Sequence, residues 1–156
     1  VELQPMQHAC AKCAATVLPC GDVFVVGGRN SNMSWRVSRE GVGRHAAVYS
    51  PEADTWSALP SMSVPREVPA CTVLSSGKIA VFGDNCDDED IVEAFDPKQR
   101  TWERLPLLGF RARDTPEATH AASVPGGLIV VGGTQRARGK WSLAPAQLFD
   151  EVTGRW

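Results

Sequence analysis

An aromatic residue is followed seven positions later by tryptophan at three places in this 156-residue chain. Turn-forming residues such as Pro, Asp and Gly separate the two members of each pair, which are Tyr49–Trp56, Phe95–Trp102 and Phe149–Trp156. This pattern predicts a strand that ends on an aromatic residue, a short hairpin loop, and a strand that begins with Trp. Because the interval recurs without a slip, we predict a repeat protein built from strand hairpins.

Two further strands are expected before each hairpin. Short apolar runs that end in glycine cover residues 22–28, 78–84 and 127–133, and they are typical of a buried strand followed by a tight turn. Similar apolar segments precede them at residues 14–18 and 70–74 and around 121–124. One repeat therefore has four strands and about fifty residues, and the fold class is predicted to be all-β.

Residues 6–18 also have features of a helix. They lack Gly and Pro, are rich in Ala, and place apolar side chains near helical spacing. The similarity of residues 14–18 to residues 70–74 favours a strand instead, and we predict a strand there.

The pattern resembles the kelch repeat, the blade unit of one class of β-propeller. The resemblance rests on the glycine pairs at 27–28 and 132–133, the aromatic residue of the third strand and the Trp that begins the fourth; Gly83-Asp84 departs from it. It implies three blades, each a four-stranded antiparallel meander, at residues 1–62, 63–108 and 109–156. Residues 1–6 would be the tail of a preceding fourth strand, and the third repeat would lack most of its own. The aromatic and Trp side chains are expected to pack between blades.

The two ends of the chain indicate a longer parent protein. Leu3-Gln4-Pro5-Met6 is similar to Leu59-Pro60-Ser61-Met62, which follows a repeat Trp, and the chain ends on Trp156. Propellers close with roughly 4–8 blades. We therefore expect further propeller blades in the same parent chain.

Composition and net charge limit the classes of partner and the compartment that we expect. Charged residues make up 22% of the chain and the net charge is −2, which favours neither nucleic acid nor an anionic membrane as a partner. No apolar run approaches the ~18 residues of a membrane-spanning helix. The five cysteines are odd in number and too few for a disulfide scaffold, so a reducing compartment such as the cytoplasm is expected.

Candidate partner-binding residues lie in the long loops between the second and third strands of each repeat. In a meander these loops share one face, and long loops on a rigid scaffold commonly carry binding residues. The first and third loops are basic and the second is acidic, so Arg would hold a carboxylate or phosphate and Trp would anchor a partner. The residues are Arg29, Trp35, Arg36, Arg39, Arg44, Arg66, Asp87, Asp88, Arg136, Arg138 and Trp141. Alternatively, these loops are solvated and their charges pair with neighbours.

Arg66 lies in the link before the first strand of the second repeat and not in one of these loops, and it enters the set for a different reason. Kelch repeats often have Arg at the start of the first strand, and Arg66 fits that place in the second repeat. Arg111 or Arg113 fits it in the third, whereas the first repeat has Gln7-His8 nearby.

No metal site, cofactor or catalytic residue is predicted. The acidic run at residues 87–90 lacks the order of ligands and the central Gly of an EF-hand. Cys10-Ala11-Lys12-Cys13 has zinc-like spacing, but no second such motif follows, and strand alternation predicts that the two thiols lie on opposite faces. The three His residues have no Ser or Cys partner in a recognisable motif.

Three functions remain open at this point. Kelch propellers commonly serve as protein-interaction platforms, including substrate receptors beside a domain that recruits a ubiquitin ligase, so the first is a binding module whose partner is another protein or an acidic peptide. The second is the propeller of a galactose-oxidase-like or sugar-isomerase enzyme whose catalytic residues lie outside this segment. The third is assembly, in which two copies form a six-bladed ring.

Overall fold

The structure is a computed structural model that describes residues 3–29, 43–83, 91–107, 120–132, 134–137, 140–143 and 145–156; for 134–137 and 140–143 it describes the backbone. These residues form strands and turns with no helix among them, which confirms the all-β prediction. Residues 14–17 form a strand, so the helical interpretation of residues 6–18 is excluded. In the part of the chain described, no helix is long and apolar enough to cross a membrane.

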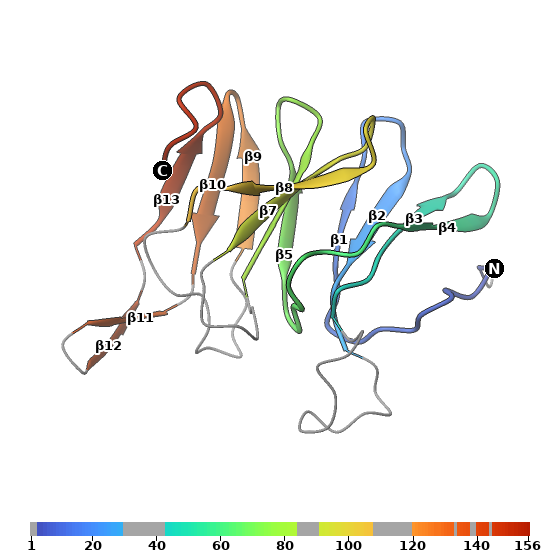
Figure 1. Ribbon diagram of the computed structural model, residues 1–156, viewed down its shortest axis with the longest axis horizontal. Helices are drawn as coiled ribbons and strands as arrows, with labels where there is room; N and C mark the ends of the chain where they lie inside the picture. Colours follow the sequence, from blue (N-terminus) through green and yellow to red (C-terminus); the bar gives the residue numbers. More distant parts are fainter. Residues whose placement is uncertain are drawn as a thin grey trace.

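Three antiparallel sheets follow one another along the chain, and we call them blades 1, 2 and 3 (Figure 1). Blade 1 has the order β1 (Ala14–Val17), β2 (Val23–Val26), β3 (Ala46–Ser50) and β4 (Thr55–Leu59). Blade 2 repeats it with β5 (Ala70–Val73), β6 (Ile79–Phe82), β7 (Val92–Asp96) and β8 (Thr101–Leu105). Blade 3 has three strands, β9 (His120–Val124), β10 (Gly127–Val131) and β13 (Gln147–Asp150). The repeat boundaries at residues 62 and 108 stay a prediction.

The third long loop contains a hairpin that the sequence pattern did not predict. It consists of β11 (Thr134–Ala137) and β12 (Lys140–Leu143), which pair with each other and with no other described strand. Their backbones leave the body of blade 3 between β10 and β13 (Figure 1).

The aromatic and Trp residues pair across the predicted hairpins. Tyr49 lies opposite Trp56 and Phe95 opposite Trp102, with ring centroids 5.0 and 5.1 Å apart. The last turn residue before the Trp strand has a positive φ in each blade: Asp54 (49°), Arg100 (57°) and Gly154 (64°). In blade 2 the carboxylate of Asp96 accepts hydrogen bonds from the main-chain N–H groups of residues 98 and 99, and Asp150 does the same in blade 3. The Asp side chain therefore stabilises the turn in blades 2 and 3 by satisfying main-chain N–H groups.

The glycine pair after β2 has a steric cause. Gly28 has a φ of +89°, and a Cβ there would lie 2.7 Å from the carbonyl oxygen of Ala11. Gly27 has a φ of +67°, and a Cβ there would lie 2.7 Å from the side chain of Pro69, in the link to blade 2. Side chains at either position would push the neighbouring chain away.

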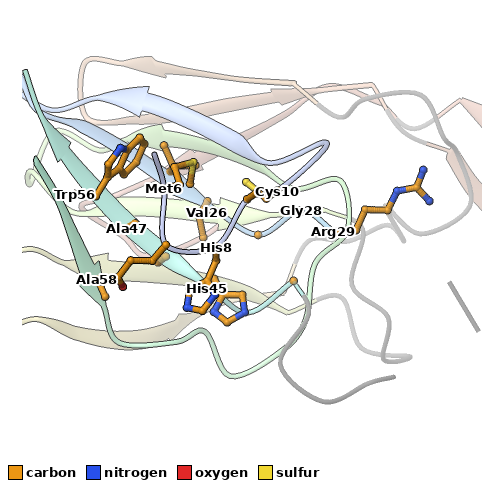
Figure 2. Close-up of a pocket in the computed structure, with 16 residues that line it drawn as sticks. Met6, His8, Cys10, Val26, Gly28, Arg29, His45, Ala47, Trp56 and Ala58 are labelled. Atoms are coloured by element: carbon orange, nitrogen blue, oxygen red, sulfur yellow. The ribbon is translucent and has the colours of Figure 1, made fainter. Parts of the chain in front are cut away.

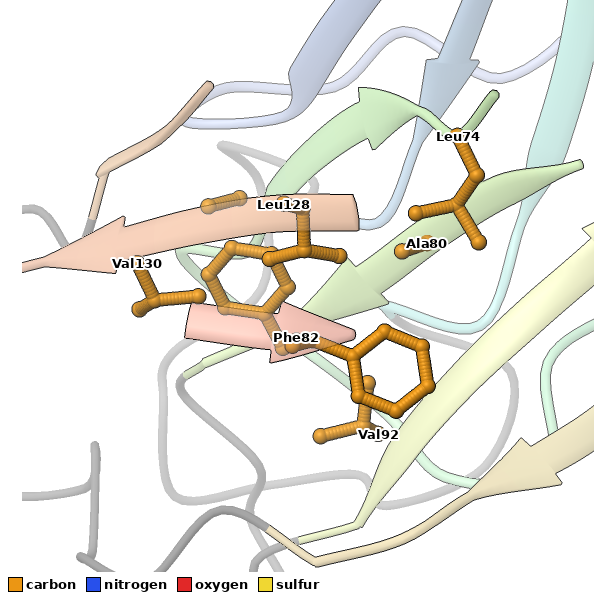
Figure 3. Close-up of a cluster of buried hydrophobic side chains, with 8 residues drawn as sticks. Leu74, Ala80, Phe82, Val92, Leu128 and Val130 are labelled. Carbon is orange, nitrogen blue, oxygen red and sulfur yellow. The ribbon is translucent and has the colours of Figure 1, made fainter. Parts of the chain in front are cut away.

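The core lies between the blades. Phe24 of blade 1 is fully buried and contacts Phe95 and Trp102 of blade 2, at ring-centroid distances of 5.8 and 6.4 Å. A second cluster fills the space between blades 2 and 3, where Phe82 of β6 meets Leu128 of β10 (Figure 3). Alternate residues of β6 face blade 1 and blade 3, so its burial on both sides explains its uniformly apolar sequence. Packing between blades is confirmed for Phe95 and Trp102 and for Phe149 and Trp156.

Candidate functional site

The sheets have two distinct ends. Short turns at residues 51–54, 97–100 and 151–154 lie at one end, and the long connections leave from the other (Figure 1). We call the second the loop end; among the described residues it includes Arg29 after β2, residues 43–45 before β3, and the link around Arg66. The predicted partner-binding residues belong to this end or to its loops.

Arg29 and Arg44 both reach the surface. The guanidinium of Arg29 lies 3.1 Å from the carboxylate of Glu67, and both side chains are about one third exposed (39% and 32%). Arg29 is thus an exposed cation already paired with a neighbour, as the solvated-loop alternative expects. Such a pair is weak enough for a partner carboxylate to compete for the guanidinium.

Most of the remaining predicted site lies outside the described residues. These are Trp35, Arg36, Arg39, Asp87, Asp88 and Arg138. Arg136 and Trp141 occupy opposite positions in the β11–β12 register, so the hairpin brings their backbones together. Their role in binding stays a prediction.

We predicted that Arg66 contacts a partner. In the structure its side chain is fully buried (0% exposed). Its guanidinium donates hydrogen bonds to the carbonyl oxygens of Gly83 (2.9 Å) and Ile91 (2.5 Å) and lies 3.3 Å from the carboxylate of Glu93. Glu93 is equally buried (1%) and accepts a hydrogen bond from the main-chain N–H of Ser63 at 2.8 Å. Through these contacts, Arg66 and Ser63 of the link between blades 1 and 2 are bound to Glu93 of β7. The sequence feature that could have predicted this buried ion pair is Glu93, a carboxylate among the apolar residues of β7.

A pocket of about 510 Å³ opens beside blade 1, between the N-terminal segment and β2–β4 (Figure 2). The imidazoles of His8 and His45 stack at one side of it, with centroids 4.2 Å apart and planes 12° from parallel. Burial lowers the pKa of His45 below its ordinary value, and the neighbouring His8 lowers that pKa further. Met6 and Trp56 lie at the other side. The sequence does not predict this pocket, because its lining comes from four separate segments.

Comparison with known proteins agrees with this geometry, although no protein-family model matches the chain. The F-box/kelch-repeat protein At4g39290 of Arabidopsis thaliana is 28% identical over 130 residues, which cover 77% of this chain and 34% of that protein. At3g46050, of the same description and plant, is 29% identical over 133 residues, covering 84% and 32%. At4g34170 is 44% identical over 62 residues, covering 38% and 21%. The chain is a kelch-repeat region homologous to plant F-box/kelch-repeat proteins.

The kelch-repeat region spans about a third of the length of the relatives that match most of it. Its three sheets of four, four and three strands are consistent with kelch blades, and the matched relatives carry kelch repeats by name.

The Cys10–Cys13 motif of the kelch-repeat region has a different arrangement from the one we predicted. Cys10 and Cys13 were expected on opposite faces, yet their side chains are hydrogen-bonded to each other. Strand β1 begins only at Ala14, and Lys12 has a φ of 61°, so strand alternation does not extend to these residues. Burial, followed by the contact with Cys13, raises the pKa of the Cys10 thiol to about 12. Within the described ranges, no three His, Cys, Asp or Glu side chains are grouped so as to hold a metal ion.

Proposed function

We propose that this kelch-repeat region is a protein-binding module that selects a partner through the loop end of its blades. In the parent protein, it would select the substrate that a neighbouring domain brings to a ubiquitin ligase. The observation that carries the proposal is that the relatives matching most of the chain combine kelch repeats with an F-box in their names.

The physical organisation supports this role. Phe24, Phe82 and Leu128 are fully buried between blades, so the sheets form a rigid body. The short turns at the opposite end use their polar groups internally, as the Asp96 and Asp150 turns show. The longer connections leave from the loop end, and their sequences are the basic and acidic ones; such loops on a rigid scaffold suit partner recognition. Basic loops complement an acidic peptide or an acidic protein surface.

The enzyme alternative gains no support from Tyr49, the single tyrosine of the chain. Its ring is buried against Trp56, and its hydroxyl donates a hydrogen bond to the carboxylate of Asp54 at 2.6 Å. Tyr49 therefore serves packing and the hairpin turn.

Affinity purification of the full-length protein from cells tests the proposal. Two variants reverse charge in the basic loops, Arg36→Glu/Arg39→Glu and Arg136→Glu/Arg138→Glu. Lys98→Glu reverses an exposed charge at the turn end and serves as the control. We expect at least one loop variant to reduce recovery of specific partners by about tenfold, and Lys98→Glu to retain them. Thermal melts establish that each variant is folded. Full retention of every partner by both loop variants would overturn the proposal.

A further inference from the structure

The main chain of Arg66 is bonded near both ends of the connection between β2 and β3, residues 27–45. Its carbonyl oxygen accepts a hydrogen bond from the N–H of Gly28 at 2.9 Å, and its N–H donates one to the carbonyl oxygen of Gly43 at 2.9 Å. The approach is close, because a Cβ on Gly43 would lie 2.9 Å from the main-chain nitrogen of Arg66. The link between blades 1 and 2 thus holds the two ends of this connection together.

The side chain of the same residue is bonded to both ends of the connection between β6 and β7, residues 83–91. One nitrogen of the Arg66 guanidinium donates to the carbonyl oxygen of Gly83, the first residue of the connection, and the other donates to that of Ile91, the last. Both bonds are buried, where hydrogen bonds are stronger than in water. Arg66 therefore joins the bases of two connections that belong to different blades.

These two connections carry opposite charge. Residues 27–45 contain four Arg and one Glu, and we call them the basic connection. Five of the nine residues 83–91 are Asp or Glu, and we call them the acidic connection. Because a single residue joins their bases, we expect the two charges to meet the same partner. A partner that complements both carries an acidic group beside a basic group.

The chemistry of arginine suits this position. A guanidinium offers separate nitrogens in a rigid plane and can hold two carbonyl oxygens at once, whereas a lysine ammonium is a single point. The carboxylate of Glu93 balances the charge of Arg66 and also accepts the main-chain N–H of Ser63 in the link. Since the Arg66 side chain is fully buried, any effect on a partner would be transmitted through the two connections.

We propose that Arg66 is a positioning residue for partner recognition. It fixes the basic and acidic connections relative to each other, so that together they bind a partner segment in which an acidic group lies beside a basic group. This inference rests on the proposed function, in which the loop end meets the partner. It adds a coupling between blades: a change at the base of the acidic connection is felt at the base of the basic one.

Hydrogen–deuterium exchange of the full-length protein tests this coupling without a partner. Arg66→Lys retains a cation beside Glu93 but lacks the two-nitrogen fork. We expect exchange to become about tenfold faster at residues 83–91 and also at the Gly28 N–H in the other blade. Glu151→Ala, at the turn end, is the control and should leave Gly28 unchanged. Faster exchange at residues 83–91 with unchanged exchange at Gly28 would overturn the proposal.

Recovery of the partner that the wild-type protein binds tests the effect on recognition. Arg66→Lys should reduce this recovery about tenfold. Arg66→Met/Glu93→Leu, which replaces the buried pair by hydrocarbon, should do the same even if Arg66→Lys does not fold. Asp87→Lys/Asp88→Lys should also reduce it, because both connections contact the partner. Glu151→Ala should retain the partner, which separates positioning from a general loss of stability.

The outcomes distinguish this proposal from the proposed function. If Arg36→Glu/Arg39→Glu loses the partner while the folded Arg66 variants and Asp87→Lys/Asp88→Lys retain it, Arg66 is not a positioning residue and the proposed function stands. If the charge-reversed variants of the basic loops retain every partner, the proposed function fails.

Discussion

The indole N–H of Trp102 donates a hydrogen bond to the main-chain carbonyl of Pro60, 2.7 Å away across the boundary between blades 1 and 2. Trp156 makes the same bond to Pro106 at 2.9 Å, and Trp56 makes it to Gln4 at 2.9 Å. Gln4 thus takes the place that Pro60 and Pro106 hold after their own blades. The repeat Trp therefore joins consecutive repeats by a directional bond as well as by packing.

We predict that Trp102→Ala lowers the free energy of unfolding by about 3 kcal/mol or more, because it removes the aromatic contact with Phe24 and Phe95. Trp102→Phe retains most of the packing and loses the hydrogen bond to the exposed Pro60 carbonyl, so it should cost about 0.5–1.5 kcal/mol. Denaturant titration of both variants measures the difference. Equal stability of Trp102→Ala and wild type would show that the Trp does not join the blades.

The buried Arg66–Glu93 pair should be sensitive to loss of one partner. Arg66→Met leaves the Glu93 carboxylate buried without its cation, and we expect a loss of about 3–5 kcal/mol. Arg66→Met/Glu93→Leu removes both charges and should cost less than the sum of the two single substitutions. A double-mutant cycle by chemical denaturation measures this. Strict additivity would mean that the two side chains do not interact.

Stability should fall on mild acidification because burial, and to a smaller extent the neighbouring His8, lowers the pKa of His45. The pKa of folded His45 lies below its ordinary value of 6.5, so between the two values the unfolded chain binds more protons than the folded one. Arg29 is the other charged group of the pocket lining, and it is paired with Glu67. We expect the melting temperature to decrease from pH 7.5 to pH 5.5, and His45→Asn to weaken this decrease. An identical pH profile for His45→Asn would exclude His45 as its cause.

Glu151 joins blade 3 to a turn of blade 2. Its carboxylate accepts hydrogen bonds from the main-chain N–H of Ser75 (2.8 Å), the Ser75 hydroxyl (2.9 Å) and the main-chain N–H of Ser76 (3.1 Å). Glu151→Ala should cost about 1 kcal/mol, since the contact is exposed, and should speed amide hydrogen exchange at residues 75 and 76. Unchanged exchange at both amides would contradict the contact.

The repeat could be predicted because its determinants are local. The seven-residue interval from Tyr49 to Trp56 is set by one hairpin, and positive-φ turn residues and Gly28 are required by backbone geometry at single positions. Because each of these features depends on a few neighbouring residues, it recurs at a fixed spacing in the sequence. The strand order and the packing of blades follow from them.

The parts that could not be predicted depend on contacts between distant segments. Arg66 resembles a surface cation by its type, and only its meeting with Glu93 on β7 allows it to be buried. The pocket beside blade 1 is lined by four segments that are separate in the sequence, on the face of the blade turned away from blade 2. The β11–β12 hairpin lies inside a charged segment without the alternation that marks a strand.

Hydrogen–deuterium exchange of the full-length protein, with and without a partner recovered by affinity purification, shows which end of the blades the partner covers. If the loop end recognises the partner, binding should slow exchange at residues 29–45, 84–91 and 133–146. The turn end at residues 51–54, 97–100 and 151–154 should exchange as it does in the unbound protein. Slower exchange confined to the turn end, with no change at the loop end, would mean that the loop end does not recognise the partner.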